Sequence, residues 1–145
     1  MGVHISKELR RFNRLLGEIN GFYHETAVKL GLSDSVMAVL YVLCSEGERC
    51  PLQEIVRQSG ASKQTINSAI RKLEREGAVR LERGEGRGKN VCLTGPGREL
   101  ARRTVLPVIR IEDEVYASWT AEELRAYLEQ TEQFLTAMRE KTKQL

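Results

Sequence analysis

The residues between Ser62 and Arg75 are of the types that contact nucleic acid. Ile66, Ile70 and Leu73 recur at three- and four-residue spacing, which predicts a helix with one buried face. At steps of about 100° per residue, the opposite face carries amides, hydroxyls and cations. This outward face comprises Gln64, Thr65, Asn67, Ser68, Arg71, Lys72 and Arg75.

These side chains match the hydrogen-bonding groups of base edges in the major groove of DNA. Amides pair with adenine and arginine pairs with guanine. An ordinary solvated helix face, the alternative interpretation, usually mixes Glu with Lys, but here both acids, Glu74 and Glu76, fall in the last turn. We expect base contacts from Gln64, Thr65, Asn67, Ser68 and Arg71, and backbone contacts from Ser62, Lys63, Lys72, Arg75, Arg80 and Lys89.

The surrounding pattern predicts the elements that position this helix. A short helix is expected to start at Pro51 and to end at Gly60. The next helix begins within three residues of Gly60, with Ser62 as its N-cap. From Ala78 the hydrophobic period changes to two, which predicts a β-hairpin whose tip, residues 84–89, has glycine at every second position. Helix, tight turn, helix and hairpin is the order of a winged helix-turn-helix.

Long amphipathic helices flank this module. Apolar residues recur from Ile5 to Leu30, and a Thr120-x-x-Glu123 capping box starts a helix that continues to Met138. Pro107 predicts a kink or break in the helix before it. The faces are longer than a small core needs, so we expect them to pack against a second copy of the chain.

The expected fold is therefore mainly α, with a small β-hairpin wing. We expect residues 1–32 and 96–145 to form a helical dimerisation region and residues 33–95 to form the DNA-binding region, in one compact domain overall. The 145 residues carry a net charge of +3, and residues 60–92 hold eight cations against four acids. No apolar run is long enough for a membrane span and no signal peptide is visible, so we expect a cytoplasmic protein without membrane contact.

The sequence offers little for catalysis or metal binding. Its two histidines, His4 and His24, lie in one amphipathic helix pattern, and the three cysteines match no metal-ligand spacing. We therefore expect no enzyme activity, no metal and no cofactor. Cys50 precedes a helix start, where the helix dipole would lower its pKa, so it is a candidate redox sensor, with inert packing as the alternative. Cys92 is expected on the polar side of its strand. A protein-docking winged helix is a further alternative.

These segments together resemble the MarR (multiple-antibiotic-resistance regulator) family of winged-helix transcription factors. The resemblance rests on residues 31–33, on residues 62–66 and 72–77 of the recognition helix, and on residues 91–94 with Gly97. It implies a homodimer that binds a pseudo-palindromic operator and usually represses nearby genes, with release by a small ligand or by thiol oxidation.

The resemblance extends to the wing. Similar proteins carry Asp-x-Arg at the wing tip, where this chain has Glu85-Gly86-Arg87. Carried onto this chain, Arg87 would enter the minor groove of DNA, and Arg83 is expected beside it.

Overall fold

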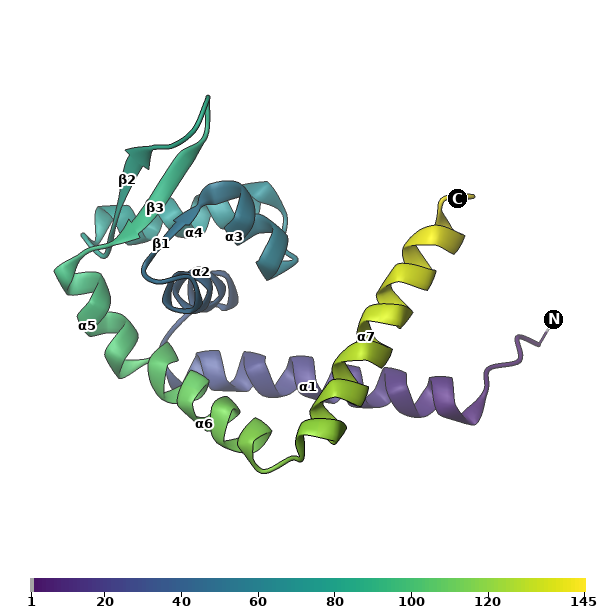
Figure 1. Cartoon of the computed structure of the whole chain (residues 1–145). Helices are drawn as coiled ribbons and strands as arrows, with labels where there is room; N and C mark the ends of the chain where they lie inside the picture. The colour runs from purple at the N-terminus through teal and green to yellow at the C-terminus, as the bar shows by residue number, and fades with distance from the viewer. Residues whose placement is uncertain (1) are drawn as a thin grey trace. The chain divides into compact units, whose positions relative to one another are not determined.

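The computed structural model describes residues 2–145 as seven helices and three short strands (Figure 1). The first part of the chain contains α1 (Lys7–Lys29), α2 (Asp34–Ser45), β1 (Arg49–Pro51), α3 (Leu52–Ser59), α4 (Lys63–Arg75), β2 (Val79–Arg83) and β3 (Lys89–Leu93). It is followed by α5 (Gly95–Arg103), α6 (Val105–Ala117) and α7 (Ala121–Thr142). This confirms the expected fold class, a mainly α winged helix.

The chain divides into two compact units, and the boundary falls after Leu106 in the first turn of α6. The first unit contains α1 to α5 with all three strands, and the second begins at Pro107 and ends at Leu145. This contact boundary does not coincide with the expected boundaries at residues 32 and 95. Which segments form the dimerisation region stays a prediction.

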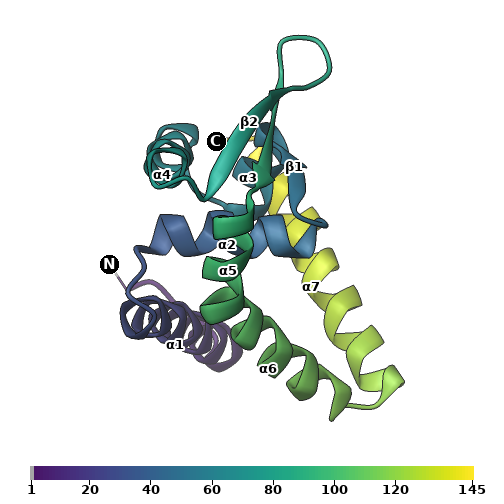
Figure 2. The same ribbon diagram turned by 90° about the vertical axis from the view of Figure 1, so that its left-hand side faces the viewer.

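Helix α2 is the centre of the first unit. Its side chains Val39, Leu40 and Leu43 are fully buried. Helices α3 and α4 and the sheet pack around it, as Figure 2 shows in the view turned by 90°. Helix α4 contributes Ile66 and Leu73 to the same core, so burial of its apolar stripe fixes which of its faces points outward.

The sheet has the antiparallel order β1-β3-β2. Strands β2 and β3 form the expected hairpin, but β1 was not expected. Pro51 was predicted to be the first helical residue; it lies in β1 instead and helix α3 begins at Leu52. The reason is tertiary: Cys50 pairs with Val91 across the ladder and is buried, which holds residues 49–51 extended.

Local hydrogen bonds fix where α4 begins. Gly60 has a φ of 68°, a left-handed conformation that lets the chain turn sharply after α3. Ser62 then caps α4, because its Oγ accepts a hydrogen bond of 3.1 Å from the Thr65 amide. Both features were predicted, and they place the first turn of α4 next to α3.

The wing loop is better ordered by hydrogen bonds than its glycine content suggests. The Gly84 amide donates to the Gly88 carbonyl at 2.9 Å, and the Gly88 amide donates to the Glu85 carbonyl at 3.0 Å. Of the three glycines at the tip, only Gly86 has a positive φ, at 61°. The two sides of the loop approach closely, since a β-carbon added at Gly84 would lie 3.2 Å from the Gly88 carbonyl oxygen.

A break separates α5 from α6, as expected near Pro107. Helix α5 ends at Arg103, and Thr104 leaves the helical region with φ of −124° and ψ of −84°. Pro107 is the third residue of α6, and backbone amides in the first turn of a helix have no acceptor within the helix. Proline, which lacks an amide hydrogen, is therefore tolerated at this position because α5 ends before α6 begins.

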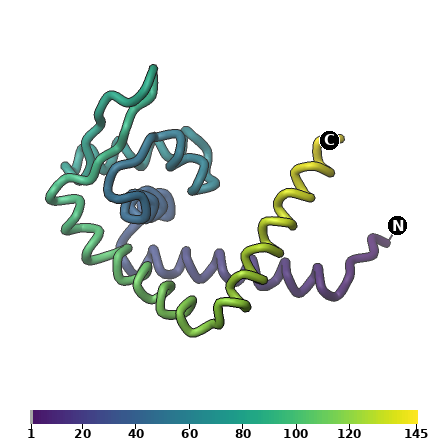
Figure 3. The backbone as a smooth tube through the Cα atoms, viewed as in Figure 1, coloured from purple at the N-terminus to yellow at the C-terminus, as the bar shows by residue number. Residues whose placement is uncertain are grey.

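The second unit consists of most of α6 and the whole of α7, joined at a sharp corner (Figure 3). The predicted capping box is present: Thr120 accepts from the Glu123 amide, and Glu123 accepts from the Thr120 amide. At this corner Trp119 stacks on Tyr116 and meets Tyr127 edge-on. No residue of α7 is buried, although the structure describes all of them.

Helix α1 also exposes its apolar face. Leu9, Leu16 and Ile19 are 43–49% exposed.

Within residues 2–145 no single helix is long and apolar enough to cross a membrane; only α1 and α2 together meet that criterion, as a pair bent by 94°.

Candidate nucleic-acid interface

The outward face of α4 has the composition expected from the sequence. Gln64, Thr65, Ser68 and Arg71 are exposed, and Asn67 is half-buried. Lys72 and Arg75 are exposed farther along the helix, and Ser62 and Lys63 are exposed at its start. The acids Glu74 and Glu76 lie at its C-terminal end. An anionic partner would therefore meet donors and cations over the first two-thirds of the helix.

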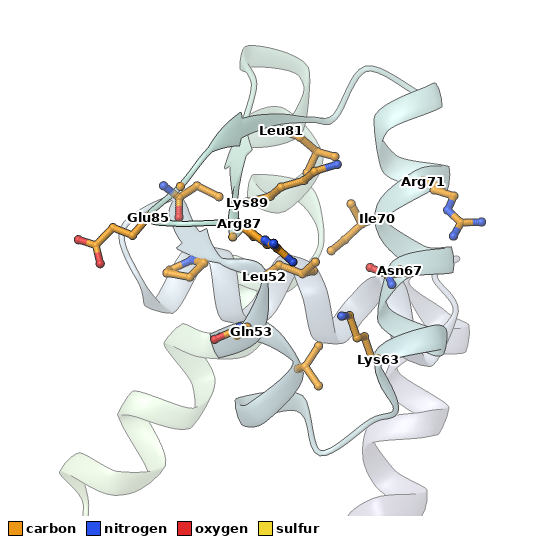
Figure 4. Close-up of a pocket in the computed structure, with 15 residues that line it drawn as sticks. Leu52, Gln53, Lys63, Asn67, Ile70, Arg71, Leu81, Glu85, Arg87 and Lys89 are labelled. Atoms are coloured by element: carbon orange, nitrogen blue, oxygen red, sulfur yellow. The ribbon is translucent and has the colours of Figure 1, made fainter.

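Between α4 and the wing the surface forms a groove of about 1320 Å³ (Figure 4). Its apolar lining includes Leu52, Val56, Ile70 and Leu81. Lys63, Asn67 and Arg71 line it from α4, and Arg87 and Lys89 line it from the wing.

The close-up shows how the charges are arranged. Arg87 extends from the wing into the groove toward Leu52, and Lys63 points into it from the start of α4. Glu85 points away from it. The groove thus presents cations to an occupant while its nearest acid faces outward, which suits a phosphate-bearing strand.

Apart from Ser62, the N-cap of α4, and Arg80, the expected site residues lie in three places. Lys63, Asn67, Arg71, Arg87 and Lys89 come together in the groove. Gln64, Thr65, Ser68, Lys72 and Arg75 lie on α4 outside the groove lining. Arg83 lines a smaller hollow of about 500 Å³ beside the wing, together with Arg87 and Lys89.

Arg80 lies on the outer face of the sheet, away from these groups. It pairs with Cys92 in the strand register and forms an ion pair with Glu82, which also contacts Arg49 at 3.2 Å. The hydrogen bond from Arg80 lowers the pKa of the Glu82 carboxyl. A phosphate would have to compete with this carboxylate for Arg80.

The groove lining also includes residues that were not predicted as site residues, among them Leu52, Gln53 and Asn90. Gln53 comes from the first turn of α3, Leu52 precedes it, and Asn90 lies at the base of the wing. Gln53 had a usable signal, because the first turn of the helix before a recognition helix lies beside it in a helix-turn-helix. The position of Asn90 in the groove depends on the register of β3, which the residue type alone does not predict.

The surroundings of Cys50 favour the inert packing of its thiol over a redox role. Cys50 is only 1% exposed, and its pKa is raised to about 11 by burial and then by Glu46 and Glu54. Burial removes the water that would solvate a thiolate, and the two carboxylates repel its negative charge. These effects oppose the stabilisation of the thiolate that a nearby helix start would give.

The other two thiols are in similar surroundings. Cys92 lies on the polar face of the sheet, as expected, yet it is buried, and burial raises its pKa. Burial also raises the pKa of Cys44. Cys92 pairs with Arg49 and Cys50 pairs with Val91, so the two thiols face opposite sides of the sheet and are not placed to form a disulfide.

The Cys50 thiol should therefore resist alkylation in the folded protein. At pH 8 we expect iodoacetamide to modify it far more slowly than in the urea-unfolded chain, as measured by mass spectrometry of its peptide. Between about pH 9 and 11 the unfolded chain loses this proton and the folded chain keeps it, so the thiol's contribution to stability falls as pH rises. Equal alkylation rates in the two states would contradict this assignment.

The described residues show no metal centre. Within residues 2–145 no group of three or more His, Cys, Asp or Glu side chains is placed to hold a metal ion. His24 instead contacts Asp34 through Nδ1, at 2.9 Å, and so links α1 to the first turn of α2.

Comparison with known proteins agrees with this architecture. The sequence profile of the MarR family matches residues 30–89. No curated protein matches the chain by sequence.

Several solved structures are similar over nearly the whole chain. A MarR family regulator from Neisseria meningitidis superposes with a TM-score of 0.83 at 19% identity, covering 96% of this chain and 99% of that one. A MarR family transcriptional regulator from Silicibacter pomeroyi is 28% identical with a TM-score of 0.69, covering 87% and 86%. A MarR family transcriptional regulator from Streptomyces coelicolor, solved in complex with DNA, is 20% identical with a TM-score of 0.65, covering 94% and 90%.

Proposed function

We propose that this chain, whose residues 30–89 match the MarR family profile, is a MarR family member and a sequence-specific regulator of transcription that binds double-stranded DNA. The observation that carries this proposal is the groove between α4 and the wing, which Lys63, Arg71, Arg87 and Lys89 line with positive charge. The acid-free part of α4 beside it supplies the donors for base edges. We propose that it acts in the cytoplasm.

The proposed binding mode follows from these positions. Helix α4 enters the major groove, where Gln64, Ser68 and Arg71 contact base edges with Thr65 and Asn67 beside them. One phosphate backbone then lies between α4 and the wing, held by Lys63 and Lys89. Ser62, Lys72 and Arg75 contact the backbone at the edges of α4, and Arg83 supports Arg87 at the minor groove.

We propose a homodimer on a pseudo-palindromic operator. The apolar faces of α1 and α7 are exposed in the single chain, and such faces bury apolar area when a second copy covers them. Residues 1–32 and 96–145 supply this dimerisation region in the proposal, and residues 33–95 bind DNA. Repression of nearby genes, relieved by a small ligand, is the regulatory mode that fits the family resemblance.

Two alternatives are less well supported. Thiol-based release needs an accessible thiolate, and the three cysteines have raised pKa values. A protein-docking winged helix needs apolar anchors on α4, whose exposed face carries Gln64, Ser68 and Arg71 instead.

Selection of bound fragments from random DNA duplexes tests the proposal. We expect enrichment of a palindrome whose half-sites are one helical turn apart, and binding that weakens steeply with salt. Failure to enrich any sequence, together with weak binding of all duplexes at low salt, would contradict sequence-specific recognition.

The role of Arg87 gives a separate prediction. The minor groove of an A·T-rich flank is narrow and strongly negative, so a cation inserted there gains more than one at a wider groove. Arg87→Ala should therefore lose more affinity on an operator with A·T-rich flanks than on one with G·C-rich flanks, as measured by gel shift. Lys89→Ala is the matched control, for which we expect similar losses of affinity on both operators. If Arg87→Ala also loses similar affinity on both operators, Arg87 acts only as a general positive charge and does not enter the minor groove.

A further inference from the structure

The groove between α4 and the wing has an apolar lining that a phosphate contact does not use. This lining combines side chains from α3, α4 and β2, namely Leu52, Val56, Ile70 and Leu81. Leu52 and Leu81 are half-buried, so each leaves apolar surface in water. A partner that removes this surface from water is bound more tightly, and a charged phosphate does not do so. The occupant of the groove therefore needs an apolar part as well as a charge.

Cations line the same groove. Lys63 and Arg71 reach it from α4, and Lys89 reaches it from the wing. Arg87 extends toward Leu52 (Figure 4), and in the proposed binding mode it moves to the minor groove. Leu52 is then open to the strand that crosses the groove.

A sugar-phosphate strand has both kinds of group. Its phosphates match the cations, and its sugar rings are the apolar part between the phosphates. In DNA the C2′ atom of each ring carries only hydrogens, whereas in RNA it carries a hydroxyl group that donates and accepts hydrogen bonds. A hydroxyl pressed against leucine side chains loses water and gains no partner, which costs free energy. The apolar lining therefore fits deoxyribose better than ribose.

We propose that Leu52 and Leu81 pack on the deoxyribose rings of the strand that crosses the groove, and that this contact selects against 2′-hydroxyl groups. The inference rests on the binding mode proposed above and adds a specificity that phosphate contacts cannot supply, because phosphates are the same in DNA and RNA. The amides of Gln53, Asn67 and Asn90 also line the groove and can pair with a hydroxyl near them. The selection is therefore confined to the sugars that lie on the two leucines.

A ribose scan of the selected operator tests this contact. Each duplex carries a single ribonucleotide at a successive position of one half-site, in strands that are otherwise DNA. We expect affinity to fall by about threefold to tenfold at one or two neighbouring positions of one strand, measured by competition gel shift. A 2′-fluoro nucleotide at the same positions favours the ring pucker of ribose but has no hydroxyl, so we expect affinity close to that of the DNA operator.

Serine variants assign the effect to the leucines. Leu52→Ser and Leu81→Ser each supply a hydroxyl partner, so we expect the ribose penalty to shrink to about twofold or less at the position that each side chain contacts. Leu32→Ser is the matched control, because Leu32 is half-buried but lies outside the groove lining, and it should keep the full penalty. The penalty is a ratio of two affinities of one variant, so a loss of folded protein cancels in it.

The possible results separate this contact from DNA binding itself. A scan without any ribose penalty, or an equal penalty for 2′-fluoro nucleotides, would overturn the proposal and leave DNA binding intact. A full penalty in both groove variants would also overturn it, because the leucines would not then contact the sugars. A wild-type protein that binds no duplex would instead contradict the proposed function.

Discussion

Gly97→Ala should destabilise the first unit by about 3 kcal/mol or more. A β-carbon at Gly97 would lie 1.9 Å from the Ala78 carbonyl oxygen and 2.9 Å from its carbon. Both atoms are backbone, so no side chain can move aside. We expect a lower urea midpoint in unfolding followed by circular dichroism.

The start of α5 is held tightly against the turn that follows α4. The Thr94 amide donates to the Ala78 carbonyl at 3.1 Å, and the Thr94 hydroxyl donates to the Gly77 carbonyl. The same hydroxyl accepts from the Gly97 amide and caps α5. Displacing α5 at Gly97 therefore strains the end of the recognition helix, and DNA affinity should fall together with stability.

Gly95→Ala is the matched control for this prediction. It lies in the first turn of the same helix, has no atom within 4 Å of its added β-carbon and does not have a positive φ. Alanine is the better helix former, so this change should be neutral or slightly stabilising. If the two variants unfold at the same urea concentration, the close approach at Gly97 does not constrain the fold.

The elements that could be predicted are those whose signals are local. The stripe of Ile66, Ile70 and Leu73 sets both the existence and the orientation of α4, because any tertiary structure must bury that face. The Ser62 cap and the Thr120–Glu123 capping box depend on residues three apart, so they also appear in the sequence.

The features that could not be predicted depend on distant pairing. Strand β1 is three residues long and exists because β3 pairs with it, so its own sequence carries no period. The burial of Cys50 follows from that pairing, so the position of this thiol before a helix start did not reveal its surroundings. The Arg80–Glu82 ion pair, in contrast, could have been predicted from the sequence, since residues two apart in a strand share a face.

The groove is the part of the candidate site that needed the structure. Cations on α4 and on the wing are evident from composition, but only the packing of α3 against both shows that Gln53 and Leu52 complete the lining. The sequence predicted candidate groups for DNA contact on α4 and on the wing, and the fold determines which of these candidates share one surface.

Arg71→Ala should lose affinity mainly for the cognate operator, by about 1 to 3 kcal/mol, with a relaxed preference at one symmetric base pair. Arg71 is exposed on α4 at the edge of the groove, and in the proposed binding mode its guanidinium contacts a base edge. Arg71→Ala removes the whole bidentate contact with guanine in the cognate operator. A random duplex seldom offers this contact, so it loses little affinity when Arg71 is removed. Competition gel shifts with cognate and random duplexes measure this difference.

Lys72→Ala is the matched control, because it removes the next cation along the same helix from a position outside the groove lining. A phosphate contact carries no sequence information, so its loss should weaken both duplexes alike and reduce the slope of log affinity against log salt by about one per protomer. If Arg71→Ala shows this uniform pattern instead, Arg71 holds a phosphate. The specificity of α4 must then come from Gln64 and Ser68, whose alanine variants would carry the cognate-selective loss.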